Sequence, residues 1–301
     1  MTTTKQHRYE TEIDPNGDSA GARILRLIPP GSRVLELGAG PASLTRLLSG
    51  NLRCDVTAVD IDPTVLDQLA IHARSVHALD LNRADWDAVL SAAEGRFDAV
   101  IAADVLEHLY DPWSTMTRMK GLLNEAGAII LSVPHAGHCV LAACLMDEDF
   151  DYREWGLLDR SHIRFFGLKN VQELHRANGL EIEDAGFVVR TPKMTEFAER
   201  WRRLPKDVRR ALRRNRFSCV YQVVTRAVPA ERARRSLKLI EQQVPEPPRE
   251  LVDYWAKVMN EVPLPPQSDR TSTIERVGGG EAVRGSGFLL SLRESFSGRR
   301  G

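Results

Sequence analysis

Short apolar runs alternate with amphipathic segments through the first half of the chain, and this alternation constrains the fold most. The runs cover residues 33–38, 55–60, 75–80, 97–104 and 127–134. The segments between them repeat apolar residues at helical spacing. Strands that are apolar on both faces and separated by helices belong to a parallel sheet that is covered on both sides. The sequence therefore predicts a doubly wound α/β domain.

Composition limits what such a domain can bind. The 301 residues are 43% hydrophobic and carry 41 basic against 41 acidic groups, so no net field draws the chain to nucleic acid or an anionic membrane. Four scattered cysteines form no CxxC pair, and we expect reduced, mostly buried thiols. The N-terminus lacks the apolar core of a signal peptide, and the most apolar run is interrupted by Pro134, His135 and His138. We expect a cytoplasmic enzyme or binding protein.

The ligand of an open α/β sheet binds beyond the carboxyl ends of the strands, which here means residues 36–42, 60–62, 80–82 and 103–108. The loop after the first strand reads GAGPAS and lacks the third glycine of a dinucleotide site. Glu36 would repel a phosphate and favour a cationic ligand such as a sulfonium or an ammonium group. Asp60 ends the second strand, where a carboxylate can accept hydrogen bonds from both ribose hydroxyls. The pattern indicates a site for an adenosine without phosphates.

These stretches resemble the motifs of class I S-adenosylmethionine-dependent methyltransferases over roughly residues 20–190. The matching segments are VLELGAGPAS, VTAVDIDP, ALDLN and FDAVIAADVLEHLYDP, in that order. The resemblance implies a Rossmann-like sheet of seven strands, mostly parallel with the last strand antiparallel, and S-adenosylmethionine as cofactor. The chain departs from the family pattern at Ala42, where a third glycine is common.

The resemblance also assigns cofactor contacts. Gly38 and Gly40 would let the backbone approach the methionine part. Asp60, with Ile61 beside it, would hold the ribose. Asp80 would face the adenine amino group while Leu81 packs on the ring. Asp104 and Glu36 complete the cofactor set, with Asp104 near the amino acid moiety.

Simpler interpretations stand beside these assignments. Glu36 could be a surface carboxylate, and Asp60 could be the N-cap of the helix that follows it. A nicotinamide-dependent dehydrogenase shares the fold and an acid at the position of Asp60.

Residues 132–167 form a second informative stretch, which contains LLDRSHIRFF. It resembles the segment after the fifth strand of methyltransferases associated with sugar and cell-surface polysaccharide pathways. Aromatic faces combined with carboxylates suit a polyhydroxylated acceptor. We therefore expect residues 135–166 to form an acceptor lid that binds a glycan or a small molecule. The candidate contacts are Tyr152, Trp155, Asp159 and Arg164.

Methyl transfer from a sulfonium needs no metal, but an alcohol acceptor must lose a proton near the transition state. Histidine is the economical base, and the candidates are His135, His162 and His108. A structural role is the alternative for each, such as a contact between His162 and Asp159 that braces the lid. The spacing of His135, His138 and Cys139 matches no closed zinc pattern, so we predict a buried loop there and no metal.

The last third of the chain is charged. Residues 200–216 carry nine Lys or Arg and one acid, Asp207, within a predicted helical insertion at 191–216 that is either one helix or a pair broken at Pro205. A solvated helix face and a peripheral contact with an anionic membrane are both open. Residues 229–262 are predicted to be a helical extension that packs on the domain or on a second subunit of a homodimer, and 263–301 to be a disordered tail.

Together these patterns predict an N-terminal segment at 1–19 and a methyltransferase domain at 20–228. We expect an O-methyltransferase that acts on a sugar or glycan-like hydroxyl. A small-molecule or lipid hydroxyl is the runner-up, favoured by a more apolar lining around 138–166. A partner subunit that binds the cofactor without turnover is the alternative from another class.

Overall fold

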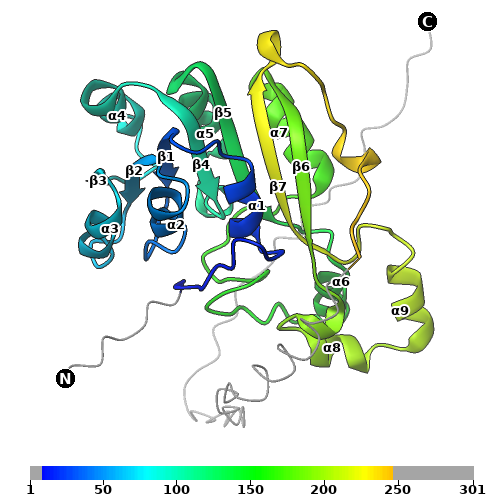
Figure 1. The fold of residues 1–301 in the computed structure, drawn as a ribbon. Helices are drawn as coiled ribbons and strands as arrows, with labels where there is room; N and C mark the ends of the chain where they lie inside the picture. The colour runs from blue at the N-terminus through cyan, green and yellow to red at the C-terminus, as the bar shows by residue number, and fades with distance from the viewer. Residues whose placement is uncertain (1–8, 247–301) are drawn as a thin grey trace, which may run out of the picture. The chain divides into compact units, whose positions relative to one another are not determined.

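The computed structural model describes residues 9–246, and these contain one seven-stranded sheet in the order β3-β2-β1-β4-β5-β7-β6 (Figure 1). The first five strands are parallel, whereas β7 runs antiparallel to both of its neighbours. This confirms the predicted fold class. The strands are β1 Arg33–Leu37, β2 Asp55–Asp60, β3 Ser75–Ala78, β4 Phe97–Ala103, β5 Leu123–Pro134, β6 Leu180–Val189 and β7 Val220–Pro229.

Helices follow the strands as the alternation predicts. The α-helices are α1 Ala20–Arg26, α2 Thr45–Gly50, α3 Leu66–His72, α4 Trp86–Glu94, α5 Pro112–Gly121, α6 Cys139–Met146, α7 Leu168–Ala177, α8 Ala198–Arg203 and α9 Lys206–Leu212. Short 3₁₀ turns are η1 Leu106–His108, η2 Pro192–Met194, η3 Ala230–Arg232 and η4 Leu239–Glu241. No helix in residues 9–246 has both the length and the apolar character that a membrane span requires.

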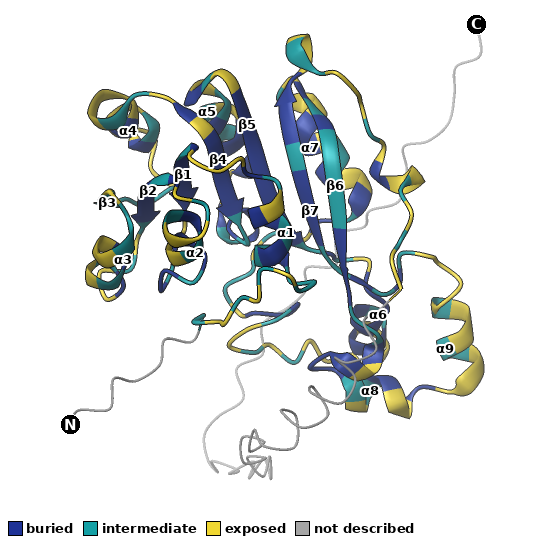
Figure 2. Ribbon diagram, in the orientation of Figure 1, coloured by how far each residue is buried: buried dark blue, intermediate teal, exposed yellow. Residues whose placement is uncertain are grey.

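Two apolar clusters cover the two faces of the sheet. Leu35 and Leu37 of β1 point into the larger cluster, whereas Val34 points into the cluster on the opposite face. The same alternation divides Ile129 from Ile130 on β5, since successive side chains of a strand leave opposite faces. Figure 2 shows the central strands buried and the outer surfaces of the helices exposed. Burial on both faces explains why these strands read as continuous apolar runs.

A third apolar cluster joins α6 to α8 and is contacted by Tyr221 of β7. Val140 and Cys144 of α6 pack there with Leu158, Phe197 and Trp201. Figure 1 shows α6, α8 and α9 gathered at one end of β6 and β7. The basic stretch is thus a pair of helices: Leu204, which precedes Pro205, takes the extended backbone that a following proline favours, and α8 ends there. None of the residues of α9 is buried.

The loop predicted at 135–139 is present over residues 135–138, with His135 and His138 buried, and α6 begins at Cys139, where His138 caps the helix by accepting a hydrogen bond from Val140 N–H. Another sequence prediction about local structure is wrong. The predicted helix over 231–244 is absent, and only η3 and η4 occur there. Its backbone is instead held by β6 and α7, since Leu237 N–H donates to Ile182 O and Leu239 N–H donates to Gln172. The remainder of the C-terminal extension and the predicted tail lie outside the described residues.

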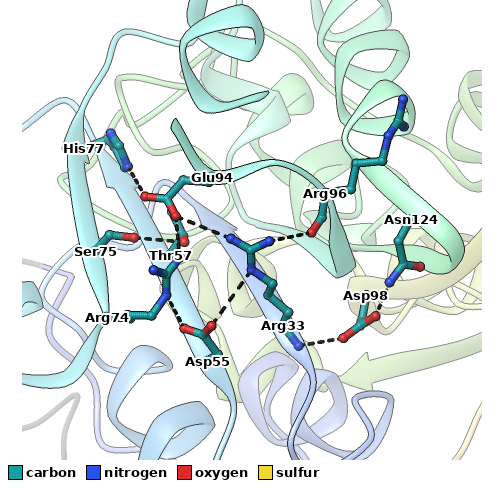
Figure 3. A network of polar contacts seen from close by, with 10 residues as sticks. All are labelled: Arg33, Asp55, Thr57, Arg74, Ser75, His77, Glu94, Arg96, Asp98 and Asn124. Atoms are coloured by element: carbon teal, nitrogen blue, oxygen red, sulfur yellow. Dashed lines mark hydrogen bonds and ion pairs between the residues drawn. The ribbon is translucent and has the colours of Figure 1, made fainter. Parts of the chain in front are cut away.

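A network of charged side chains closes the amino ends of the strands, opposite the edge where the sequence places the ligand (Figure 3). Glu94, at the end of α4, pairs with Arg33, Arg74 and His77. Arg74 also lies 2.6 Å from Asp55 at the start of β2. Burial by itself would raise the pKa of Glu94, but hydrogen bonds from His77, Ser75 and Arg74 hold it below its ordinary value. The network therefore joins four segments of the chain at the amino ends of the strands, away from the predicted ligand site.

Candidate functional site

The loop after β1 takes left-handed backbone conformations at three alternate residues. Gly38, Gly40 and Ala42 have φ angles of 64°, 53° and 61°. A Cβ at Gly38 would lie 2.6 Å from Val105, whereas a Cβ at Gly40 would meet open space. Ala42, which replaces the usual third glycine, is buried among Ala39, Ala58, Val65 and Leu69 of the same cluster. The loop therefore keeps the turn that glycines usually provide, at the cost of a strained alanine.

Glu36 lies beneath this loop with only 2% of its surface exposed. Its carboxyl accepts a hydrogen bond of 2.8 Å from the hydroxyl of Thr45 at the start of α2. Burial raises the pKa of Glu36 to about 8, so the carboxyl is mainly protonated at neutral pH until a cation approaches. The interpretation of Glu36 as a surface carboxylate is wrong.

Asp60 joins the ends of two strands. Its carboxylate accepts hydrogen bonds from Gly40 N–H at 2.7 Å and from Asp62 N–H at 2.8 Å. The N-cap alternative is wrong, because α3 begins only at Leu66. Ile61, the next predicted contact, is 63% exposed. The carboxylate predicted to hold the ribose is thus held against the glycine loop, and this contact was not foreseen from the sequence.

The turn after β3 is tied to the turn after β4. Asp80 accepts a hydrogen bond of 2.9 Å from Asn82 N–H, and Asn82 accepts one of 2.9 Å from Tyr110 N–H. Leu81 is half-buried against the larger core cluster. Asp80 and Leu81, predicted for the adenine, therefore lie at the same sheet edge as Asp60.

Asp104 follows β4 with a left-handed φ of 54°. Its two carboxylate oxygens accept hydrogen bonds from Ser132 Oγ at 3.0 Å and Gln222 Nε2 at 2.7 Å. Burial raises the pKa of Asp104, and these two hydrogen bonds oppose the rise. Ser132 of β5 and Gln222 of β7 therefore orient the carboxylate predicted to lie near the amino acid moiety, and sequence patterns gave no signal for either.

Two of the three candidate histidines meet after β4. The rings of His108 and His162 lie edge to face with centroids 4.7 Å apart. His162 Nε2 lies 3.9 Å from Oε1 of Glu107, which is 1% exposed. Burial lowers the pKa of His162 to about 4 and raises the pKa of Glu107 well above its ordinary value. Glu107 was not singled out from the sequence, although it precedes His108 in DVLEHL.

The other two histidines of the 132–167 stretch make structural contacts. His135 is buried, with Nδ1 3.1 Å from Val220 O, and burial lowers its pKa. His138 uses Nε2 toward Arg190 O and Nδ1 toward Val140 N–H. The structure therefore does not gather the three ligand atoms considered for a metal at 135–139.

The two charged lid residues predicted to bind the acceptor have hydrogen-bond partners within the protein. Asp159 is buried and accepts hydrogen bonds from Tyr9 and Ser161, and Arg164 donates to Tyr110 O. The structure thus gives these two predicted substrate contacts internal partners. The other two, Tyr152 and Trp155, are 59% and 39% exposed.

A cavity of about 440 Å³ lies away from these residues, lined by Arg26, Leu27, Glu183, Asp184, Arg226, Arg234 and Arg235. Glu183 pairs with Arg226 at 2.6 Å and Asp184 with Arg235 at 3.4 Å. None of the predicted site residues lines it, and its acids already have basic partners.

Comparison with known proteins gives a consistent family. A family model described as a methyltransferase domain matches residues 6–185. The ubiquinone biosynthesis O-methyltransferase of Xanthomonas axonopodis pv. citri is 27% identical over 171 residues, 56% of this chain and 70% of the relative. The protein of the same name from Xanthomonas campestris pv. campestris (strain B100) is 27% identical over 126 residues. These residues make up 42% of this chain and 52% of the relative.

Solved structures with a similar chain trace include a putative methyltransferase from Bacillus halodurans, at 15% identity and a TM-score of 0.47, over 69% of this chain and 97% of that one. Another is magnesium protoporphyrin IX methyltransferase from Synechocystis with bound S-adenosylhomocysteine, at 15% identity and a TM-score of 0.46, over 69% of this chain and 79% of that one. Likeness at this level carries no inference about the acceptor.

Proposed function

This chain belongs to the methyltransferase family whose domain model matches residues 6–185, and we propose that this S-adenosylmethionine-dependent enzyme methylates a hydroxyl oxygen. In the reaction the oxygen forms a bond to the methyl carbon as the carbon–sulfur bond breaks. S-adenosylhomocysteine leaves as a neutral thioether, and the hydroxyl proton must be removed. The name of the relatives at about 27% identity supports oxygen as the acceptor atom.

The observation that carries this proposal is the cluster of Glu107, His108 and His162 close to Asp104. Both imidazoles have Nδ1 near a backbone carbonyl oxygen, with His108 3.2 Å from Ser161 O and His162 3.4 Å from Leu157 O. A carbonyl only accepts, so Nδ1 carries the hydrogen and Nε2 carries the lone pair. Such lone pairs can act on an acceptor hydroxyl, as bases or as ligands of a cation that polarises it.

We further propose that the acceptor is a largely apolar molecule bearing a hydroxyl, such as a phenol with a hydrocarbon chain. Four acids of the lid pair with arginines: Asp147 and Asp149 with Arg200, Asp151 with Arg153, and Glu154 with Arg160. Beside these charged groups the lid exposes a set of apolar and aromatic side chains: Leu145, Met146, Phe150, Tyr152, Trp155, Ile163 and Phe165. A polyhydroxylated sugar needs many polar partners, so the paired acids and the exposed apolar groups favour the runner-up over the predicted glycan.

Transfer of a labelled methyl group tests both parts. Purified protein would be offered a prenylated phenol, a catechol and a panel of sugars, and the methylated atom identified by mass spectrometry. We expect methyl ether formation on the apolar phenol and a fall of at least 100-fold in kcat/KM for His162→Gln. His72→Gln, at the end of α3, is the matched control.

Three outcomes would overturn the proposal in whole or in part. Methylation of nitrogen or carbon would contradict hydroxyl chemistry, and methylation of sugars alone would restore the glycan acceptor. S-adenosylhomocysteine binding without transfer to any of these compounds would support the alternative of an inactive partner subunit.

A further inference from the structure

Glu107 is a buried acid, and the methyltransferase fold by itself does not explain why its carboxyl group is buried. Both of its carboxylate oxygens are buried and have no hydrogen-bond partner within the described residues. Burying a carboxylate without a partner is unfavourable, so such a group points to a missing ligand. The side chain is 99% removed from solvent, since only 1% of the residue is exposed.

The ligand atoms around Glu107 are the right kind for a metal ion. One carboxylate oxygen of Glu107 and one nitrogen from each of His108 and His162 all lie within 4.8 Å of one another. Two ligands of a tetrahedral Zn²⁺ with bonds of about 2.1 Å lie roughly 3.4 Å apart. The 3.9 Å between His162 Nε2 and Glu107 Oε1 is close to this spacing.

The surroundings already hold the two histidines as metal ligands require. Hydrogen bonds from Nδ1 to Ser161 O and Leu157 O fix the tautomer that leaves Nε2 as the donor atom. This arrangement of a ring N–H on a backbone carbonyl is typical of histidines that bind metals. In addition, Ile163 and Arg164 donate their backbone N–H groups to Glu107 O, which fixes the segment after His162 against η1.

We propose that Glu107, His108 and His162 form a site for a divalent cation such as Zn²⁺ or Mn²⁺. Two imidazoles and one carboxylate leave coordination positions open, as in catalytic rather than structural sites. A cation there polarises the acceptor hydroxyl and lowers its pKa, and the released proton passes to water. This role rests on the proposed function, whereas cation binding itself does not. It replaces the metal-free reaction expected from the sequence.

Calorimetric titration of metal-free protein with MnCl₂ and ZnCl₂ tests the site directly. We expect one ion per chain, with affinity reduced at least tenfold in Glu107→Gln and in His162→Gln. The matched control is Glu196→Gln. Glu196 is equally buried, but its carboxylate accepts hydrogen bonds from Leu157 N–H and Tyr221 Oη. Circular dichroism would show that each variant is folded.

The outcomes separate this inference from the proposed function. Failure to bind either ion at 1:1, or equal affinity in wild type and Glu107→Gln, would overturn the metal site. Methyl ether formation that persists in EDTA would also overturn its catalytic role while leaving the O-methyltransferase in place. Specific binding without transfer to any hydroxyl would leave the site standing and overturn the proposed function.

Discussion

Two residues of the site, Ala42 and Glu36, have backbone strain or burial that the local sequence does not predict. Ala42 holds a left-handed backbone that an L-residue with a Cβ adopts at a cost of about 1 kcal/mol, and its methyl group fills a buried cluster. Glu36 holds a proton because the loop and α2 cover it. Both residues lie at the end of β1, where the predicted cofactor would approach.

Substitutions at Ala42 separate the strain of its left-handed backbone from the burial of its methyl group. Ala42→Gly relieves the backbone but removes a buried methyl worth about 0.8 kcal/mol, so we expect stability within roughly 1 kcal/mol of wild type. Ala42→Val adds bulk and a β-branch to a left-handed residue and should cost at least about 2 kcal/mol. Urea denaturation of both variants measures this, and a Val variant as stable as wild type would contradict the strained geometry.

Glu36 predicts a pH dependence of stability in the protein without cofactor. The pKa of about 8 in the folded protein exceeds the ordinary 4.5, so the folded state keeps a proton that the unfolded chain releases. This group therefore makes the free energy of unfolding fall as pH rises from 4.5 to 8, by roughly 1.4 kcal/mol per pH unit, with no further loss above that range.

Glu36→Gln should remove the contribution of Glu36 to the pH dependence of the free energy of unfolding, because glutamine does not titrate. The amide oxygen can still accept the hydrogen bond from the Thr45 hydroxyl, so the local structure should be kept. Denaturation midpoints measured from pH 5 to pH 8.5 would show it. Identical slopes in wild type and variant would mean that Glu36 is ionised beneath the loop.

At the scale of the elements, the two ends of the parallel strands differ in their side chains. The carboxyl ends of β1, β2 and β4 carry the strained loop and the acids, while the amino ends are joined by the network around Glu94 (Figure 3). Parallel strands impose this division, because all their carboxyl ends meet at one edge. Stability and ligand binding should therefore respond to different substitutions.

Glu94→Gln tests the amino-edge network. The side chain of Glu94 is 8% exposed and shared among Arg33, Arg74 and His77, so losing its charge should cost about 1–3 kcal/mol in denaturant unfolding at pH 7. Cofactor affinity should not change. The control is Glu173→Gln, whose pair with Arg176 is exposed, so its loss should have a much smaller effect on the free energy of unfolding. Equal losses in the two variants would count against the network.

At the scale of the whole domain, the segment predicted to form the acceptor lid packs at one end of the sheet. The α6–α8 cluster and the segment 147–166 add a surface on which Asp147 and Asp149 pair with Arg200 and on which aromatic side chains such as Tyr152 and Trp155 are exposed. The basic face of α9 stays exposed, and peripheral membrane contact through it remains a prediction. The paired charges and the apolar exposure together favour an amphipathic acceptor.

Tyr152→Ser combined with Trp155→Ser tests this surface. If the two exposed rings contact the acceptor, KM for a prenylated phenol should rise about tenfold while the affinity for S-adenosylhomocysteine stays within twofold. Ile71→Ser, at an exposed apolar residue on α3, is the control. An unchanged KM would place the acceptor elsewhere.

The sequence by itself determined the sheet and the order of its motifs, because strands buried on both faces must be continuously apolar and their carboxyl ends must meet at one edge. It also determined that Asp60, Asp80, Asp104 and His108 lie along that edge. Tertiary structure alone decided which partners they have. Gln222 reaches Asp104 across 118 residues, and His162 reaches Glu107 because the lid folds back onto η1.

The wrong predictions have the same cause. Residues 231–244 have helical composition, but β6 and α7 offer their backbone stronger partners. The alternative interpretation of Glu36 as a surface carboxylate fails because Thr45 and the loop cover the side chain. Local patterns fix what a segment can form, whereas burial and distant hydrogen bonds fix the charge, partner and chemistry of each side chain.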